Sequence, residues 1–207
     1  MNKSIEKLTG DIFAGINTHL SRLTDKNKLQ SLLNKLQPVS CDKELIRLGP
    51  MCDGGYLVPN DLIGIEACFS PGVGCFSLFE KECAYRGMKV FLADRSVEKP
   101  TQSHEFFVFT KKHLGVLNND KFMTIDDWVE PSLPDSQGDL LLQMDIEGAE
   151  YEVLLGASDN LLKRFRIIVV EFHSLDELCS KPFFKLTSRV FVKLLQTHTC
   201  VHNHPNN

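Results

Sequence analysis

The chain has 207 residues, 43% hydrophobic and 24% charged, which is typical of one globular domain with an ample core. The net charge is −4 and the pI is about 6.0, and we find no dense Lys/Arg cluster, so nucleic acid is not an expected partner. The seven cysteines lack a C-x-x-C pair, which favours reduced thiols over a disulfide framework. With no signal peptide and no apolar run near the ~20 residues of a membrane span, we expect a cytoplasmic protein.

The first forty residues predict an N-terminal helical extension, residues 1–40. Apolar residues recur there at three- and four-residue spacing. The first series is Ile5, Leu8, Ile12, Ile16 and Leu20, and the second is Leu29, Leu32, Leu33 and Leu36. Pro38 ends the second pattern. We expect these helices to pack on the domain that follows, residues 41–207, with partner binding as the alternative.

From Leu45 onward, short apolar runs alternate with helical patterns. Asp53, Gly54 and Gly55 indicate a hairpin turn before the first run. The five expected strands are 65–70, 89–94, 105–110, 139–145 and 166–173. The expected helices are 77–86, 124–129, 149–163 and 184–195, with a loop at 130–139. This alternation predicts right-handed crossovers and a doubly wound, Rossmann-like α/β sheet of parallel strands.

Three acids follow the fourth strand in the segment "MDIEGAE". Asp145 ends an apolar run, and Glu147 and Glu150 fall in the turn and the first helical turn after it. Ligands of open parallel sheets bind outside the carboxyl ends of the strands, so Asp145 is a candidate site residue. Glu150 has a simpler explanation, because acids favour the start of a helix.

A glycine turn follows the first strand of the sheet, and an acid follows the second. Gly72 and Gly74 allow a tight turn that a ligand can approach, and Asp94 comes about twenty residues later. This spacing is typical of a nucleoside site in which the acid accepts ribose hydroxyls. A structural turn with a solvated aspartate is the alternative.

Histidines occur at two places that could carry chemistry. His173 and Glu171 lie on one side of the fifth strand's end, where a histidine could act as a general base or be structural. His198, His202 and His204 lie near the C-terminus, but no matching Cys or acid spacing accompanies them. We therefore expect no metal site.

With these residues in view, the chain resembles the FkbM-type family of S-adenosylmethionine-dependent methyltransferases. The resemblance runs from about Arg47 to the end, in "GPMCDGGYLVP", "MTIDDWV", "MDIEGAEYEVL" and "VVEFH". It implies the class I methyltransferase fold, with seven strands in the order 3-2-1-4-5-7-6 and the last strand antiparallel. It also implies O-methylation of a hydroxyl, often on a sugar or glycan-like acceptor, with S-adenosylmethionine as cofactor.

The resemblance also assigns cofactor-binding residues. Gly72 and Gly74 would lie under the methionine part of the cofactor, Asp94 would hold its ribose hydroxyls, and Asp145 would face the methyl group. Methyltransferases of this fold usually carry an acid two residues before the first glycine, where it binds the cofactor's amino group. Here that position is Ser70, which leaves the identity of the amine-binding group open.

The resemblance also implies that Asp145, Glu147 and His173 lie near the methyl acceptor. Asp145 or His173 would be the base that takes the proton of the acceptor hydroxyl. Two other functions remain open. A nicotinamide-dependent oxidoreductase would share the glycine turn, although Ser77 stands where a third glycine or alanine is expected. A non-catalytic interaction module is the second alternative.

The C-terminal segment 197–204 can form one more strand. The family fold would place another strand between it and 166–173, so we expect an incomplete strand set and an unpaired sheet edge. The sequence does not indicate the oligomeric state.

Overall fold

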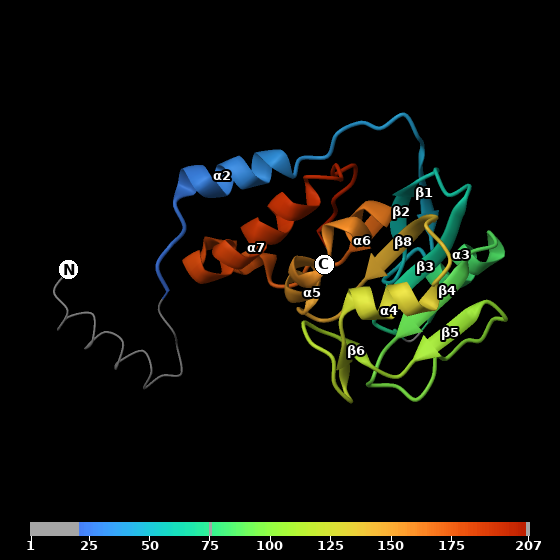
Figure 1. The fold of residues 1–207 in the computed structure, drawn as a ribbon. Coiled ribbons are helices and arrows are strands. Elements are labelled where there is room, and N and C mark those ends of the chain that lie inside the picture. Colours follow the sequence, from blue (N-terminus) through green and yellow to red (C-terminus); the bar gives the residue numbers. More distant parts are fainter. Residues whose placement is uncertain (1–20, 75, 206–207) are drawn as a thin grey trace.

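The computed structural model describes residues 21–74 and 76–205. The first expected helix, over residues 5–20, lies outside the described residues. Five parallel strands form the main sheet: β3 (Ile65–Pro71), β4 (Lys89–Ala93), β5 (Phe107–Thr110), β8 (Asp139–Met144) and β9 (Phe165–Val170). Their order is β5-β4-β3-β8-β9, which confirms the expected α/β fold and the first five positions of the expected strand order (Figure 1).

The sheet order places a switch point between β3 and β8. The chain moves outward from β3 through β4 to β5, and then returns to place β8 and β9 on the other side of β3. In such sheets, the crevice at the carboxyl ends of the two central strands is the usual ligand position. Asp145 and the turn at Gly72 directly follow these two strands.

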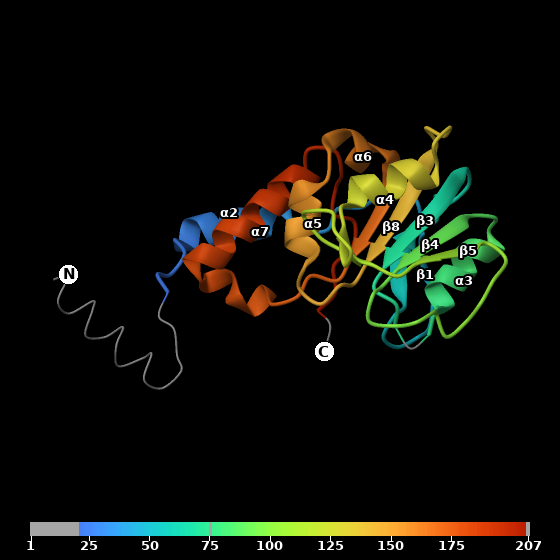
Figure 2. The same ribbon diagram turned by 60° about the horizontal axis from the view of Figure 1, so that its bottom comes forward.

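Side chains alternate between two core layers. Phe69 and Leu142, which align in neighbouring strands, face one layer, whereas Cys68 and Leu141 face the other. The first layer also holds residues of α4 (Ile125–Ser132), α5 (Glu150–Gly156), α6 (Asp159–Arg164) and α7 (Lys181–Leu194). The second holds residues of α3 (Leu78–Tyr85) and the hairpin of β1 (Leu45–Leu48) and β2 (Tyr56–Pro59). Figures 1 and 2 show the sheet between these two layers.

The expected hairpin is confirmed, since β1 and β2 pair in antiparallel register around the turn that contains Gly54. A short parallel pair, β6 (His113–Leu114) with β7 (Phe122–Met123), was not expected. A five-residue 3₁₀ helix, η1 (Leu175–Cys179), connects the end of β9 to α7. It thereby carries the chain from the sheet edge to the outer helical layer.

Several helix boundaries differ from the sequence prediction, and among them α7 begins at Lys181 instead of 184. The single helix expected over 149–163 is wrong, because the chain bends at Ala157 and Ser158 starts α6 by accepting a hydrogen bond from the Leu161 N–H (3.1 Å). The loop expected at 130–139 begins later, because α4 continues to Ser132 with Pro131 in its last turn. A serine cap starts α6, and the Leu133 N–H, which donates to the Glu130 carbonyl, closes the last turn of α4. Apolar periodicity reveals neither contact.

The second expected helix is confirmed as α2 (Lys26–Lys35), which the Asp25 carboxylate caps by accepting from the N–H groups of Asn27 and Lys28. It lies along α7 in both views, and its Leu32 is buried in the first core layer (Figures 1 and 2). The Thr24 N–H also donates to the carbonyl of Cys179 (2.8 Å). The segment at 21–39 is therefore docked on the C-terminal helical region.

The strand expected at 197–204 is wrong, because these residues adopt no regular structure. The Thr197 and His198 N–H groups donate to the Leu194 carbonyl at the end of α7, which turns the chain away from an extended path. Farther on, the Val39 N–H donates to the Cys200 carbonyl, and the His198 ring contacts the Phe165 carbonyl at 2.6 Å. Within the described residues, β9 is therefore an outer strand of the sheet. None of the described helices has the length and apolar character of a membrane span.

Candidate functional site

The first part of the site is the glycine turn, residues 72–74, at the end of β3. Gly72 has φ +91°, and its N–H donates to the Ala93 carbonyl (3.0 Å). A Cβ at this position would lie 1.7 Å from the carbonyl oxygen of Asp145. Gly72 is therefore required for the close approach of the chain after β8, a packing role that its sequence motif does not reveal. Gly74, by contrast, faces open space.

Asp94, which follows β4, braces this turn. Its Oδ2 accepts from the Val73 N–H (3.0 Å), and its Oδ1 accepts from the N–H and the hydroxyl of Ser96 (2.6 and 2.7 Å). Burial alone would raise the pKa of Asp94, but these hydrogen bonds from Ser96 and Val73 lower it overall. The structure thus brings the glycine turn and Asp94 together, as the sequence predicted.

Ser70 points into the protein interior and is fully buried. Its hydroxyl lies 2.7 Å from Glu80 Oε1 and 2.6 Å from Gln143 Oε1. The hydroxyl has one proton to donate between these two acceptors. Burial raises the pKa of Glu80 overall, although the hydrogen bond from Ser70 lowers it. A direct contact between Ser70 and a cofactor would require this network to open.

The second part of the site is the carboxylate cluster at the ends of β8 and β9. It comprises Asp145, Glu147, Glu150, Glu171 and His173. The Asp145 N–H donates to the Pro71 carbonyl (3.4 Å), so this cluster adjoins the glycine turn. The three residues expected on the acceptor side, Asp145, Glu147 and His173, are therefore in one place.

His173 is the centre of the carboxylate cluster. Its Nδ1 lies 3.1 Å from Glu150 Oε1, while its Nε2 lies 3.8 Å from Asp145 Oδ1 and 3.5 Å from Glu147 Oε2. Burial opposes the charged ring, but the carboxylates of Glu150, Asp145 and Glu147 raise the pKa of His173 overall. The Tyr151 hydroxyl also donates to the His173 carbonyl (2.6 Å), which fixes the backbone here.

Glu150 organises the turn before α5. It is fully buried, and its Oε1 accepts from the N–H groups of Ile146 and Gly148 (3.0 and 3.1 Å). In this turn, Glu147 and Gly148 adopt positive φ angles of 57° and 103°. Glu150 begins a helix, as expected, but it also holds this strained turn and orients His173, which sequence position alone did not show.

Asp145 is the least satisfied acid of the carboxylate cluster. Among the described residues, its buried Oδ1 has no hydrogen-bond partner. Burial, reinforced by the charge of Glu171, raises the pKa of Asp145 to about 6, although His173 opposes the shift. A carboxyl group with such a pKa is suited to accept a proton near neutral pH.

The hairpin adds a residue that the sequence reasoning missed. The Tyr56 hydroxyl, from β2, donates to Glu171 Oε2 (3.3 Å) and lies 3.5 Å from Gln143 Nε2. Burial and the charges of Asp145 and Glu171 raise the pKa of Tyr56 well above its usual range, so it stays a neutral donor. Tyr56 and Glu171 are 115 positions apart in the sequence, so no local pattern predicts their contact.

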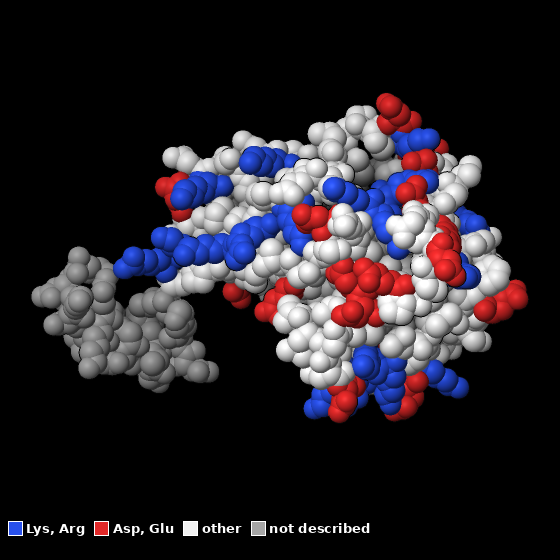
Figure 3. Space-filling model, in the orientation of Figure 1, with Lys and Arg blue, Asp and Glu red and all other residues white. Residues whose placement is uncertain are grey.

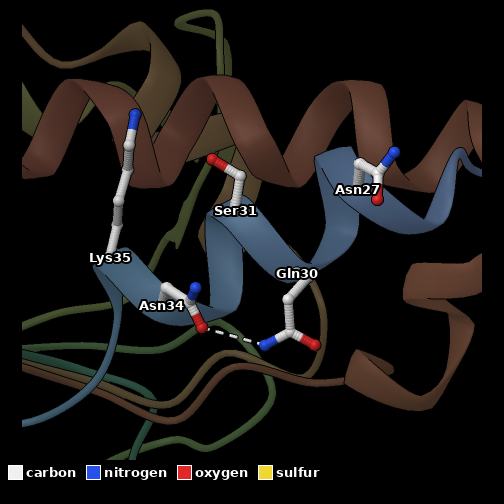
Figure 4. A pocket seen from close by; sticks show the side chains of 5 residues that line it. All are labelled: Asn27, Gln30, Ser31, Asn34 and Lys35. Carbon is white, nitrogen blue, oxygen red and sulfur yellow. Dashed lines mark hydrogen bonds between the residues drawn. The ribbon is translucent and has the colours of Figure 1, made fainter.

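Other surface features are less informative. A shallow hollow on α2 is lined by polar side chains, and its Gln30–Asn34 hydrogen bond (2.9 Å) is an ordinary i,i+4 contact (Figure 4). A second hollow lies between α2 and α7. Figure 3 shows a row of basic side chains along α7, where Lys181, Lys185, Arg189 and Lys193 recur every four residues. Neither hollow contains a strand end or an acid–base pair.

An open parallel sheet with a glycine turn and acids at its central strand ends defines a Rossmann-like domain. The family model described as "Methyltransferase FkbM domain" matches residues 83–189, more than half of the chain. The chain therefore belongs to the FkbM methyltransferase family. The matched region includes Asp94, Asp145 and His173 and begins after the glycine turn. The searches of curated proteins and of solved structures found no match.

Proposed function

We propose that this protein is an S-adenosylmethionine-dependent O-methyltransferase that acts on a hydroxyl group of a sugar or glycan-like acceptor. The observation that carries the proposal is that the family match spans Asp94, Asp145 and His173, which lie at the ends of strands β4, β8 and β9. A polyol acceptor suits the carboxylate cluster, because its carboxylates can accept hydrogen bonds from several neighbouring hydroxyl groups.

The ends of β3 and β4 fit the cofactor. Gly74 borders open space, and the hydrogen bonds to Asp94 favour its ionised form and leave Oδ2 able to accept one more, from a ribose hydroxyl. Since Ser70 faces inward, the cofactor's amino group would be bound by another group. When bound, S-adenosylmethionine would supply an electrophilic methyl group on a positively charged sulfur.

The protein's own task is to orient the acceptor hydroxyl and to take its proton. If neutral His173 donates its Nδ1–H to Glu150, then Nε2 carries the lone pair and faces Asp145 and Glu147. Asp145, with its pKa of about 6, is ionised at pH 7.5 and still basic. Either His173 or Asp145 can serve as the general base, which is worth roughly 10²–10⁴ in rate.

Calorimetry with S-adenosylhomocysteine and with NAD tests the cofactor assignment. We expect S-adenosylhomocysteine to bind and NAD not to bind. Asp94→Ala should weaken the binding by roughly 1–3 kcal/mol, because hydroxyl partners are left unpaired. Asp120→Ala, at an exposed aspartate, is the matched control and should bind as the parent does. Binding of NAD alone would favour an oxidoreductase, and binding of neither would favour a non-catalytic module.

The acceptor assignment is tested by methyl transfer to a panel of sugars and other polyols. Asp145→Asn and His173→Ala should each lower turnover more than they lower affinity for S-adenosylhomocysteine. This split separates a role in proton transfer from a role in cofactor binding. Full turnover by either variant would remove that residue from the mechanism.

A further inference from the structure

Three side chains of the carboxylate cluster offer ligand atoms to a common point. Asp145, Glu171 and His173 each contribute one such atom, and these atoms all lie within 4.8 Å of one another. Around a cation with bonds of about 2.1 Å, ligand atoms on opposite sides lie about 4.2 Å apart. Small side-chain movements would therefore close the three residues on one cation, although the sequence alone predicted no metal site.

The imidazole of His173 is already oriented for this role. Glu150 Oε1 lies 3.1 Å from Nδ1, so Nε2 is the ring nitrogen directed at Asp145. A carboxylate on the far nitrogen of a histidine is the usual support of a metal ligand, because it fixes the tautomer and raises the basicity of the other nitrogen. Glu150 itself is anchored by the Ile146 and Gly148 N–H groups, which makes the support rigid.

The hydrogen bonds around the cluster leave carboxylate oxygens unsatisfied. Asp145 Oδ1 is shielded from solvent and has no hydrogen-bond partner among the described residues, and it lies 3.8 Å from His173 Nε2, too far for a hydrogen bond. Glu150, which is 0% exposed, also has an unpartnered oxygen, Oε2. A buried carboxylate oxygen without a partner is costly, so the unpartnered Oδ1 of Asp145, which is one of the three candidate ligand residues, points to a bound ligand.

Charge leads to the same conclusion. In the part of the chain that the structure describes, the ion pairs of Asp145, Glu147 and Glu150 all run to His173. One imidazole carries at most one positive charge, so it cannot neutralise three carboxylates. A divalent cation between the ligand atoms would offset the excess.

We propose that Asp145, Glu171 and His173 bind one divalent cation of the first-row transition class, such as Mn²⁺. Two carboxylates and an imidazole are a mixed oxygen and nitrogen set, whereas Ca²⁺ prefers six to eight oxygen ligands. Three protein ligands leave coordination positions open, as in catalytic metal sites. The Tyr56 hydroxyl, which donates to Glu171 Oε2, would hold that carboxylate in place.

This inference rests on the proposed function and names how its acceptor is held. The acceptor hydroxyl oxygen would occupy an open position on the cation and pass its proton to Glu147, whose Oε2 lies 3.5 Å from His173 Nε2. The oxygen would then bond to the methyl carbon as the carbon–sulfur bond of the sulfonium breaks. With the cation bound, Asp145 and His173 would therefore act as metal ligands and not as the general base, and Glu147 would take the proton in their place.

Calorimetric titration of MnCl₂ into chelator-treated full-length protein, without cofactor, tests the site. We expect one saturable site, and at least a tenfold loss of affinity in Glu171→Gln, which keeps an acceptor for the Tyr56 hydroxyl while removing the charge. His204→Ala, in the C-terminal H-x-H, is the matched control and should bind within twofold of the parent. Absence of a saturable site, or equal losses in both variants, would overturn the proposal.

A second measurement needs no variant. In wild-type protein, substoichiometric Mn²⁺ should broaden the amide NMR signals of residues 145–150 and 171–173 before those of residues 202–204. Broadening confined to 202–204 would contradict the site. Binding of S-adenosylhomocysteine is measured separately, so a protein that binds S-adenosylhomocysteine but does not bind Mn²⁺ would refute the metal site and leave the proposed function standing.

Discussion

Asp94 and Asp145 each follow a buried strand of the same parallel sheet, and each lies near a histidine, yet their hydrogen bonds and the direction of their pKa shifts differ. Three donors from Val73 and Ser96 surround the Asp94 carboxylate, and its pKa is lowered. Asp145 Oδ1 has no hydrogen-bond partner among the described residues, and burial beside Glu171 raises the pKa of Asp145 to about 6.

This difference separates a strand end whose acid is hydrogen-bonded by the protein from one whose acid is not. At the ends of β3 and β4, Val73 and Ser96 donate hydrogen bonds to the Asp94 carboxylate. Asp94 therefore stabilises the turn whether or not a cofactor is bound. The carboxylate cluster concentrates like charges that folding alone does not compensate. Groups with such perturbed pKa values are typical of functional sites, because a ligand supplies the missing partner.

The two regions meet at Gly72, where we expect the largest effect. Gly72→Ala would place a Cβ 1.7 Å from the Asp145 carbonyl oxygen and would keep a positive φ of 91°. The backbone must shift in response, so the variant should lose more than ~3 kcal/mol of unfolding free energy in urea denaturation.

Gly74→Ala is the control for that experiment, because nothing lies within 4 Å of the added Cβ and no positive φ is required. It should change the unfolding free energy by less than ~0.5 kcal/mol. Equal losses in the two variants would show that the glycine turn does not join the regions as described.

The next largest effect should come from Asp94, the acid that accepts hydrogen bonds from the protein itself. Asp94→Asn should cost roughly 1–3 kcal/mol of unfolding free energy at pH 7, because the Val73 and Ser96 N–H groups lose a charged acceptor. The folded pKa of Asp94 is lowered, so its contribution is present above the ordinary pKa of 3.8 and is lost as the pH falls through the folded value. The two proteins should therefore converge in stability at strongly acidic pH, and a constant difference would exclude this origin.

Asp145→Asn should have a smaller effect of opposite sign. The folded pKa of Asp145 is raised from 3.8 to about 6, so its ionisation destabilises the fold above pH 6 and not below about pH 4. In chelator-treated protein at pH 7.5, the variant should gain about 1 kcal/mol, after allowance for partial solvent screening and for the lost His173 pair. A loss of stability at that pH would contradict the account of Asp145.

The smallest effect should come from Glu147→Gln. The Glu147 side chain is 88% exposed, so its charge is screened by water and its removal should not measurably change thermal unfolding. The same variant should lower methyl transfer if Glu147 takes the acceptor proton. A clear drop in melting temperature would show that the Glu147 carboxylate stabilises the fold despite its exposure to solvent.

Much of the fold was predictable because the signals are local. Nearly continuous apolar runs predicted all five strands of the sheet, and their alternation with helical patterns predicted its α/β class. The prediction was wrong at 149–163, where Ser158 caps a second helix, and at 197–204, where the chain end packs by individual hydrogen bonds to Val39 and Phe165. Such bonds depend on tertiary partners that periodicity does not encode.

The site was predictable where residue type and strand position coincide. The structure places Asp94, Asp145 and His173 at or just beyond strand ends, as the sequence predicted, and their functional roles stay predictions. Ser70 was expected near the cofactor but faces Glu80, since the alternation of β3 turns it inward. Tyr56 lies in a hairpin far away in sequence, and the proposed metal ligands come together only because β8 and β9 pair side by side.

The most direct test is an NMR titration of the side-chain carboxyl carbons of Asp94 and Asp145 in the chelator-treated protein. We predict that Asp94 titrates below 3.8 and that Asp145 titrates at about 6. This result would show that the protein's own donors stabilise the ionised carboxylate after β4, whereas burial and neighbouring acids destabilise the ionised carboxylate after β8. Titration of both groups near 3.8, or of Asp145 below Asp94, would contradict this central claim.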